Sequence, residues 1–413
     1  MFIRFLLCCL LGGVSVTAGG EPADDSLVLK ALSRQLSELR TKVQELEKVI
    51  EKLESPAPAS EPPPPSTPAS SVSPDPSEQA KAGTPSGPQF QFRGFGDLGF
   101  SHSNATTRSE SGFGLGQMDL FVTSSLSKHF GVLIETVLEA DGDGIAVDVE
   151  RFLFQYRQSR YLNVDVGRYH SAIGYYNTAY HHGKWFETAA TRPRLFEFED
   201  EGGLLPIHNV GLYFHGAIPS RSLNLHYVVE VGNGRDYENK GVQISRDVTP
   251  GKSLNVAIQA RPRRAVGLEL GVSLYHDRLI FNQRPLAQQI LAAYAVYNRG
   301  RLEAMTEFVG MRHTQTSQAG TRLRTHVPGF YSQWSYRVAG PWRPYFRFEF
   351  SNPSSRDPII QMRNGGEMVR SGYVGGVRYD LAEFAALKFE VQRIQHRNRP
   401  GENRAAINFA FTF

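Results

Sequence analysis

Twelve ionisable side chains other than tyrosine lie between His170 and His208, both included, in this 413-residue chain. Acidic, basic and imidazole groups are interspersed there. If this segment borders a narrow aqueous path, its fixed charges act on passing ions through a field that bulk water would otherwise weaken. A constriction formed by this segment would therefore be selective. Its residues are His170, His181, His182, Lys184, Glu187, Arg192, Arg194, Glu197, Glu199, Asp200, Glu201 and His208.

The histidines of this segment raise the question of a metal ion. Adjacent His181 and His182 point apart on an extended chain, which is poor geometry for holding one ion. A zinc site that joins one of them to His170, His208 or a carboxylate of residues 197 to 201 stays open as an alternative. We favour hydrogen bonds that fix the segment, and we expect no metal and no other cofactor. Protonation of these imidazoles near pH 6.5 would alter conductance.

The end of the chain shows what kind of element positions these groups. An apolar stripe with period two, as in a β-strand with one apolar face, is formed by Ile407, Phe409, Phe411 and Phe413. This ending resembles the C-terminal signal of bacterial outer-membrane β-barrels. The resemblance implies that Phe409, Phe411 and Phe413 are read by the barrel-assembly machinery. An edge strand that closes a soluble sandwich is the alternative.

Residues 89 to 413 contain sixteen runs with period-two alternation. An even number of strands returns both ends of the barrel to the same side of the membrane. Short connections follow the even-numbered runs, and mostly longer connections follow the odd-numbered runs. The mean hydropathy of −0.33 agrees, because only every second residue of a barrel strand faces lipid. The sequence predicts an all-β fold, a transmembrane antiparallel barrel. Its expected strands span 90–102, 112–124, 130–141, 147–157, 161–169, 208–217, 222–232, 253–261, 266–277, 288–298, 301–313, 328–338, 343–352, 371–381, 386–397 and 404–413.

Alternation also predicts which residues face the lumen. In the run 343–352, aromatic residues alternate with charged ones, as expected for a lipid face and a polar, water-filled interior. In the run 288–298, either of the two alternating sets of residues could face the lumen. Residues 89 to 413 hold 37 Lys and Arg against 30 Asp and Glu, a net charge of +7, which favours a slight anion preference. The expected pore wall comprises Arg93, Arg151, Arg157, Arg343, Arg347, Arg378, Glu135, Glu139, Glu303, Glu307 and Glu349, with Asp97 and Asp119 on the same face.

Three segments precede the expected barrel. Residues 1–18 read as a secretory signal, with Arg4, an apolar run and a small-residue cleavage site, and they contain both cysteines, Cys8 and Cys9. Residues 19–54 read as a periplasmic coiled coil because apolar residues are spaced 3 and 4 apart without a miss. Residues 55–88 hold 11 of the 24 prolines and read as a stiff, disordered linker. The coiled-coil core is Leu29, Leu32, Leu36, Leu39, Val43, Leu46, Ile50 and Leu53.

These features together resemble the trimeric porin superfamily of 16-stranded outer-membrane proteins. The similarity lies in the sixteen strands, the long third external connection, the terminal Phe and the N-terminal coiled coil. The Val166-Gly167-Arg168-Tyr169 strand end is similar to that of the phosphate-selective and sucrose porins, which carry such a coiled coil. The resemblance implies a homotrimer, and a third loop that folds into the lumen as its constriction. A helix of another protein as partner of the coiled coil stays open.

Function follows from this organisation. We expect an outer-membrane porin for passive diffusion of small hydrophilic solutes or ions, with a phosphate-like anion preference, surrounded by lipid and with its N-terminal region in the periplasm. The alternative is a structural protein that tethers the membrane to the cell wall through its coiled coil. We expect no enzyme and no nucleic-acid partner, because the chain shows no glycine-rich phosphate loop, no His-Glu-x-x-His and no dinucleotide fingerprint.

Overall fold

The structure is a computed structural model that describes residues 89–105, 111–141, 144–180, 183–199, 203–235, 251–316, 320–364 and 369–413. The predicted signal, coiled coil and linker lie outside the described residues, and they stay predictions. Within the described residues, no helix has the length and apolar character needed to cross a membrane.

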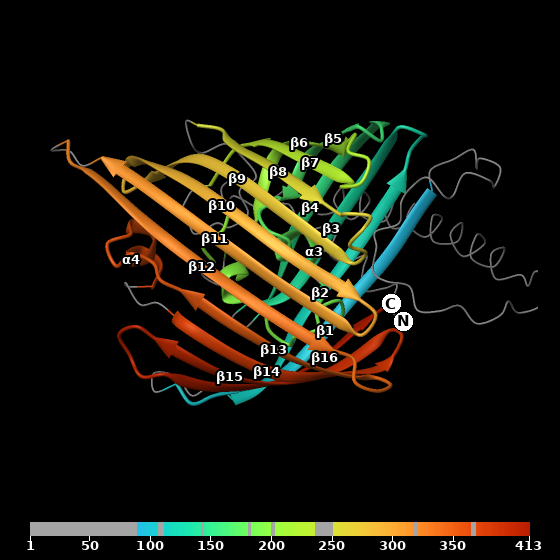
Figure 1. The fold of residues 1–413 in the computed structure, drawn as a ribbon, viewed down its shortest axis with the longest axis vertical. Helices are drawn as coiled ribbons and strands as arrows, with labels where there is room; N and C mark the ends of the chain where they lie inside the picture. The colour runs from blue at the N-terminus through green and yellow to red at the C-terminus, as the bar shows by residue number, and fades with distance from the viewer. Residues whose placement is uncertain are drawn as a thin grey trace, which may run out of the picture. The chain divides into compact units, whose positions relative to one another are not determined.

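Sixteen strands form one closed antiparallel barrel, in which each strand pairs with its neighbours in sequence and β1 pairs with β16 (Figure 1). The fold class and the number of strands predicted from the sequence are thereby confirmed. The strands are β1 Gln89–Ser103, β2 Ser111–Ser125, β3 Phe130–Asp141, β4 Gly144–Ser159, β5 Leu162–His170, β6 His208–Ile218, β7 Leu225–Gly232, β8 Ser253–Ala260, β9 Leu268–Phe281, β10 Arg284–Arg299, β11 Leu302–Thr316, β12 Arg322–Tyr336, β13 Trp342–Ser351, β14 Val369–Ala382, β15 Ala385–His396 and β16 Glu402–Thr412.

Several strands, among them β4, β9, β10 and β12, are longer than predicted. Between β9 and β10 only Asn282 and Gln283 remain outside the strands, and both have positive φ angles of 49° and 58°. A two-residue turn with positive φ at both positions matches the twist of the strands that it joins, so the hairpin continues almost to its tip. The prediction of a ten-residue connection at 278–287 is therefore wrong.

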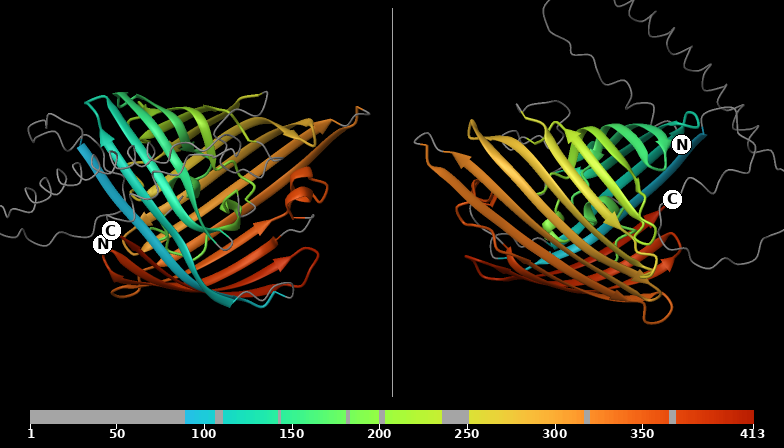
Figure 2. Two further views of the ribbon diagram at one scale, coloured as in Figure 1. Left: turned by 180° about the vertical axis from the view of Figure 1, so that it is seen from behind. Right: turned by 45° about the horizontal axis from the view of Figure 1, so that its top comes forward.

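The connection between β5 and β6 comprises residues 171–207, and its described parts, 171–180, 183–199 and 203–207, lie inside the ring of strands (Figures 1 and 2). It contains the short helix α3 Tyr176–Ala179 and the 3₁₀ turn η2 Arg194–Phe196, and we call it the third loop. A second helix, α4 Pro358–Asn364, lies in the connection between β13 and β14.

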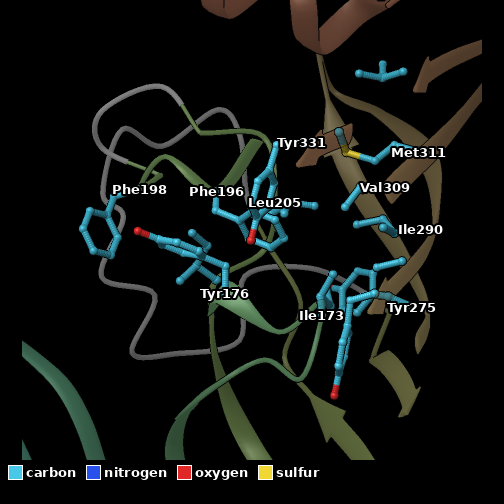
Figure 3. Packing of buried hydrophobic residues seen from close by; sticks show 14 of the residues in the cluster. Ile173, Tyr176, Phe196, Phe198, Leu205, Tyr275, Ile290, Val309, Met311 and Tyr331 are labelled. Atoms are coloured by element: carbon cyan, nitrogen blue, oxygen red, sulfur yellow. The ribbon is translucent and has the colours of Figure 1, made fainter. Parts of the chain in front are cut away.

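Part of the barrel interior is an apolar core. The third loop contributes Ile173, Tyr176, Phe196, Phe198, Leu205 and Ile207, which pack on the inward faces of β9 to β12 (Figure 3). The expectation of a polar, water-filled lumen is therefore wrong for this side of the barrel. The structure also shows which residues of β10 face inward, because Ile290 and Tyr294 are buried whereas Leu291 is exposed. Burial of these apolar side chains favours a loop seated on the wall.

The closing seam between β1 and β16 brings aromatic side chains over glycines. The terminal Phe413 exchanges two backbone hydrogen bonds of 2.9 Å with Gly94, and its ring covers the place where a Cβ of Gly94 would stand. Phe411 covers Gly96 in the same way. Phe413 is exposed on the outside of the barrel, whereas Asn408 points inward and donates to Asp97 at 2.8 Å.

Candidate functional site

Buried carboxylates on the barrel wall accept hydrogen bonds from the backbone of the third loop. Glu307 on β11 accepts from the N–H groups of Tyr175 and Tyr176, at 2.6 and 2.9 Å. Glu390 on β15 accepts from the N–H of Ala190 at 3.0 Å. An ionised acceptor makes such bonds shorter and stronger than neutral ones. Three more attachments of this kind join Glu230 to Ala172, Glu349 to Arg194, and Glu303 to the hydroxyl of Thr188.

Cationic side chains of the wall hold the carbonyl groups of the same loop. Arg378 on β14 donates to the carbonyl oxygens of Trp185 and Glu187, at 2.5 and 2.9 Å. Lys388 on β15 donates to the carbonyl of Ala189 at 3.2 Å. Arg347 on β13 donates to the carbonyl groups of residues 191 and 192. Together with the carboxylates, these cations attach the loop along most of its length, so it forms part of the barrel interior.

Charges within the loop stabilise its own shape. Lys184 and Glu187 form an ion pair of 3.0 Å, and the guanidinium of Arg192 lies 3.9 Å from the centre of the Phe198 ring. Burial opposes ionisation of Glu187, but the charges of Lys184, Arg192 and Lys388 outweigh it and hold the pKa of this carboxyl below its usual range. Glu187 therefore stays charged at neutral pH.

A second group of buried ionisable residues lies where the third loop leaves and rejoins the wall. His170 at the end of β5 pairs directly with His208 at the start of β6, with ring centres 5.4 Å apart. Pairing of β5 with β4 ends just before this point, at Arg168, after Gly167 with a φ of 135°. A Cβ on Gly167 would lie 1.9 Å from the carbonyl oxygen of Phe152, so glycine is needed for this bend.

A β-bulge adds a carboxylate to the two histidines. The register of β3 and β4 shifts between Glu135 and Thr136, which leaves Glu150 as the extra residue of β4. The side chain of Glu150 is buried and contacts Nε2 of His208. On the other side, Nδ1 of His208 lies 3.0 Å from Glu199 of the third loop. We call Glu150, His170 and His208 the histidine–glutamate cluster.

Glu199 joins this cluster to the loop. Its carboxylate accepts from the N–H of Ile207 at 3.0 Å and lies 3.4 Å from Nε of Arg235. Burial opposes its ionisation, but Arg235 and the hydrogen bond with His208 outweigh burial and lower its pKa. Glu199 is thus a charged partner of His208 at neutral pH.

The predicted wall residues divide into two groups. Arg347, Arg378, Glu303, Glu307 and Glu349 are buried and bonded to the third loop, so direct exposure to a solute path is wrong for them. The loop covers them because four of these side chains bond a polar group of its backbone, and Glu303 accepts from the hydroxyl of Thr188. Glu135 is also buried, in an ion pair with Arg151. Solvent reaches part of the second group, which is Arg93, Arg151, Arg157, Arg343, Glu139 and Asp97.

Of the predicted constriction residues, Asp200, Glu201, His181 and His182 lie outside the described residues. The others form three sets. His170, Glu199 and His208 meet at the histidine–glutamate cluster, and Lys184, Glu187 and Arg192 form a second set within the loop. Arg194 and Glu197 pair with each other at 3.6 Å, beside a cavity of about 110 Å³ between the third loop and strands β12 to β14.

Sequence reasoning missed several residues of the site. Lys388 and Glu390 are the clearest omissions, since they occupy alternate positions of β15 and the period-two rule would have identified them. Glu230 follows the same rule on β7. Glu150 has no such signal, because a bulge breaks the alternation.

Comparison with known proteins gives the fold but no closer relative. No family profile matches the chain, and no curated protein matches it. Among solved structures, an anion-selective porin from Comamonas acidovorans matches with a TM-score of 0.55 and 11% identity, covering 79% of this chain and 100% of that one. OmpF of Salmonella typhi, in complex with daunomycin, gives 0.56 and 11% over 79% and 98%. The trimer form of OmpT of Vibrio cholerae gives 0.51 and 10% over 79% and 100%. The barrel therefore has the fold of bacterial outer-membrane porins.

Proposed function

We propose that this protein is an outer-membrane channel for small polar or ionic solutes, and that its third loop narrows the path. The observation that carries the proposal is the attachment of this loop inside the barrel by at least seven ionisable wall residues. A barrel that served only as an anchor would have no need of an internal loop with fixed charges. The fold shared with porins supports the same function.

A slight anion preference is part of this proposal. Its support is the net charge of +7 on residues 89 to 413, together with the partly exposed inward arginines Arg93, Arg151, Arg157 and Arg343. Fixed positive charges beside a confined path attract anions more than cations. Arg347 and Arg378 do not contribute in this way, because they are buried against the loop.

Assembly as a homotrimer is a further part of the proposal. It is supported by the unbroken heptad spacing of residues 29 to 53, which lie outside the described residues, and by the trimer form of one matching structure. A tether to the cell wall through the same coiled coil is compatible with a channel, and no described residue favours it as a separate function.

Bilayer recordings of the purified protein test the channel. We expect discrete conductance steps. Under a salt gradient, we expect a reversal potential of the sign that shows anions to be more permeant than cations. The replacement of Arg93, Arg151, Arg157 and Arg343 by Gln should move the reversal potential toward cations, and 1 M salt should reduce the effect because the screening length falls to about 3 Å. Failure of the folded barrel to conduct would exclude the proposed function.

A further inference from the structure

We infer that Glu150, His170 and His208 form a binding site for a divalent transition-metal ion, of which zinc is the natural probe. One ligand atom from each of the three residues lies within 4.8 Å of the other two. Ligand atoms around a tetrahedral zinc ion are roughly 3.3 Å apart. Side-chain rotations that move each ligand atom by about 1 Å therefore bring all three within bonding distance of one ion. Two imidazoles and one carboxylate are a ligand set that suits zinc and its first-row neighbours.

The backbone brings these ligands together from three strands. His170 and His208 are directly paired residues of β5 and β6, and the bulge in β4 supplies Glu150 beside them. Bulges often re-aim a side chain next to a functional site. All three side chains are buried, so the site is shielded from bulk water. This placement on strands gives the ligands a rigid support.

A second layer of contacts orients the ligands as in known metal sites. Glu199 lies 3.0 Å from Nδ1 of His208, which leaves Nε2 directed at Glu150. Metal-bound histidines usually donate their other N–H to a carboxylate in this way. Glu199 is itself held by Ile207 and Arg235. On the other side, Nε2 of His170 lies 3.6 Å from Glu135.

Further carboxyl groups lie near the site. Asp119 of β2 lies diagonally across from Glu135 of β3, and no described residue forms a hydrogen bond with its fully buried carboxylate. Asp119 and Glu135 thus place two further carboxyl groups near the ligands, and Arg151 can stay paired with Glu135 when an ion binds.

Metal binding to the full chain tests the inference independently of conduction. The purified protein is stripped with a chelator and titrated with Zn²⁺ by calorimetry, and with Co²⁺ by visible absorption. We expect one ion per chain at this site and cobalt bands of a four-coordinate N/O site. The double variant His170→Gln, His208→Gln should lose both signals. Glu199→Gln should keep the site but weaken affinity by about 10- to 100-fold, because it acts through His208.

The matched control is His215→Gln on β6, since His215 also lies near a carboxylate, Asp165 at 3.6 Å, but belongs to no group of three possible ligands among the described residues. Heat-modifiability on gels confirms that each variant is folded. Unchanged zinc binding in the double variant would overturn the inference, as would loss of binding only when His181 and His182 are replaced. Absence of zinc uptake by the folded native chain would overturn it as well.

Discussion

The guanidinium of Arg347 donates two hydrogen bonds to Thr191, at 2.8 Å to the backbone carbonyl and at 3.0 Å to the side-chain oxygen. Arg347 is on strand β13 and Thr191 is in the third loop, so this contact joins wall and loop directly. Arg347 also donates to Glu349 at 2.6 Å and is 1% exposed. Its charge therefore positions the loop and is not presented to solutes.

Replacement of Arg347 by Ala should release the middle of the third loop. Removing one partner of a buried ion pair costs on the order of 3 kcal/mol, because Glu349 is left buried without it. We expect larger and noisier single-channel currents with little change in reversal potential. The control is Arg337→Ala, which removes an arginine that is 40% exposed in a turn. A shift in reversal potential without added noise would mean that Arg347 faces the path.

The bend at Gly167 should be sensitive to the smallest side chain. Gly167→Ala places a Cβ against the carbonyl of Phe152 at a φ that alanine rarely adopts, at a cost of about 1–3 kcal/mol or more. We expect a lower yield of heat-modifiable barrel on gels. Gly375→Ala is the control, because no atom lies within 4 Å of its Cβ position. Equal yields for both variants would show that the bend tolerates alanine.

Replacement of Phe411 and Phe413 by Ser should reduce the amount of protein in the outer membrane. These rings cover Gly96 and Gly94 at the closing seam, and the C-terminal stripe is the predicted assembly signal. The control is Thr412→Ser, which keeps a hydroxyl able to donate to the carbonyl of Gly94. Quantitative blotting of outer-membrane fractions measures the effect. Similar losses in both variants would contradict the distinct role of the aromatic face.

Acid should loosen the loop through Glu187. Its pKa is lowered in the folded state, so the stability that it contributes is present above 4.5, the ordinary value, and is lost as the pH falls through the lowered pKa. The share of current noise that comes from loss of the Glu187 charge should therefore appear below pH 4.5. Glu187→Gln should be noisy already at pH 7, since Lys184 and Arg192 lose their charged partner. A quiet Glu187→Gln channel at pH 7 would argue against this attachment.

The sequence predicted the strands well because period-two alternation is a local property that pairing preserves. Two features were not accessible in this way. The inward faces of β10 and β11 are apolar, as Ile290 and Val309 illustrate. When both faces of a strand are apolar, the sequence does not tell which face contacts lipid and which contacts a loop. The complementary residues, such as Ile173 and Phe196, lie far away in the chain, so their contact depends on the closed barrel. Glu150 was missed because a bulge reverses the alternation locally.

The proposed channel requires the third loop to lie in the solute path, and thiol modification of the conducting channel measures that position. Both natural cysteines lie in the predicted signal, so a single cysteine at Ala179 or Phe186 is selective; both positions belong to the loop and are exposed. A bulky water-soluble thiol reagent should reduce the current through either variant. It should leave the control Phe389→Cys unchanged, because Phe389 lies on the outer face of β15. Undiminished current after complete labelling of both loop cysteines would contradict the proposed constriction.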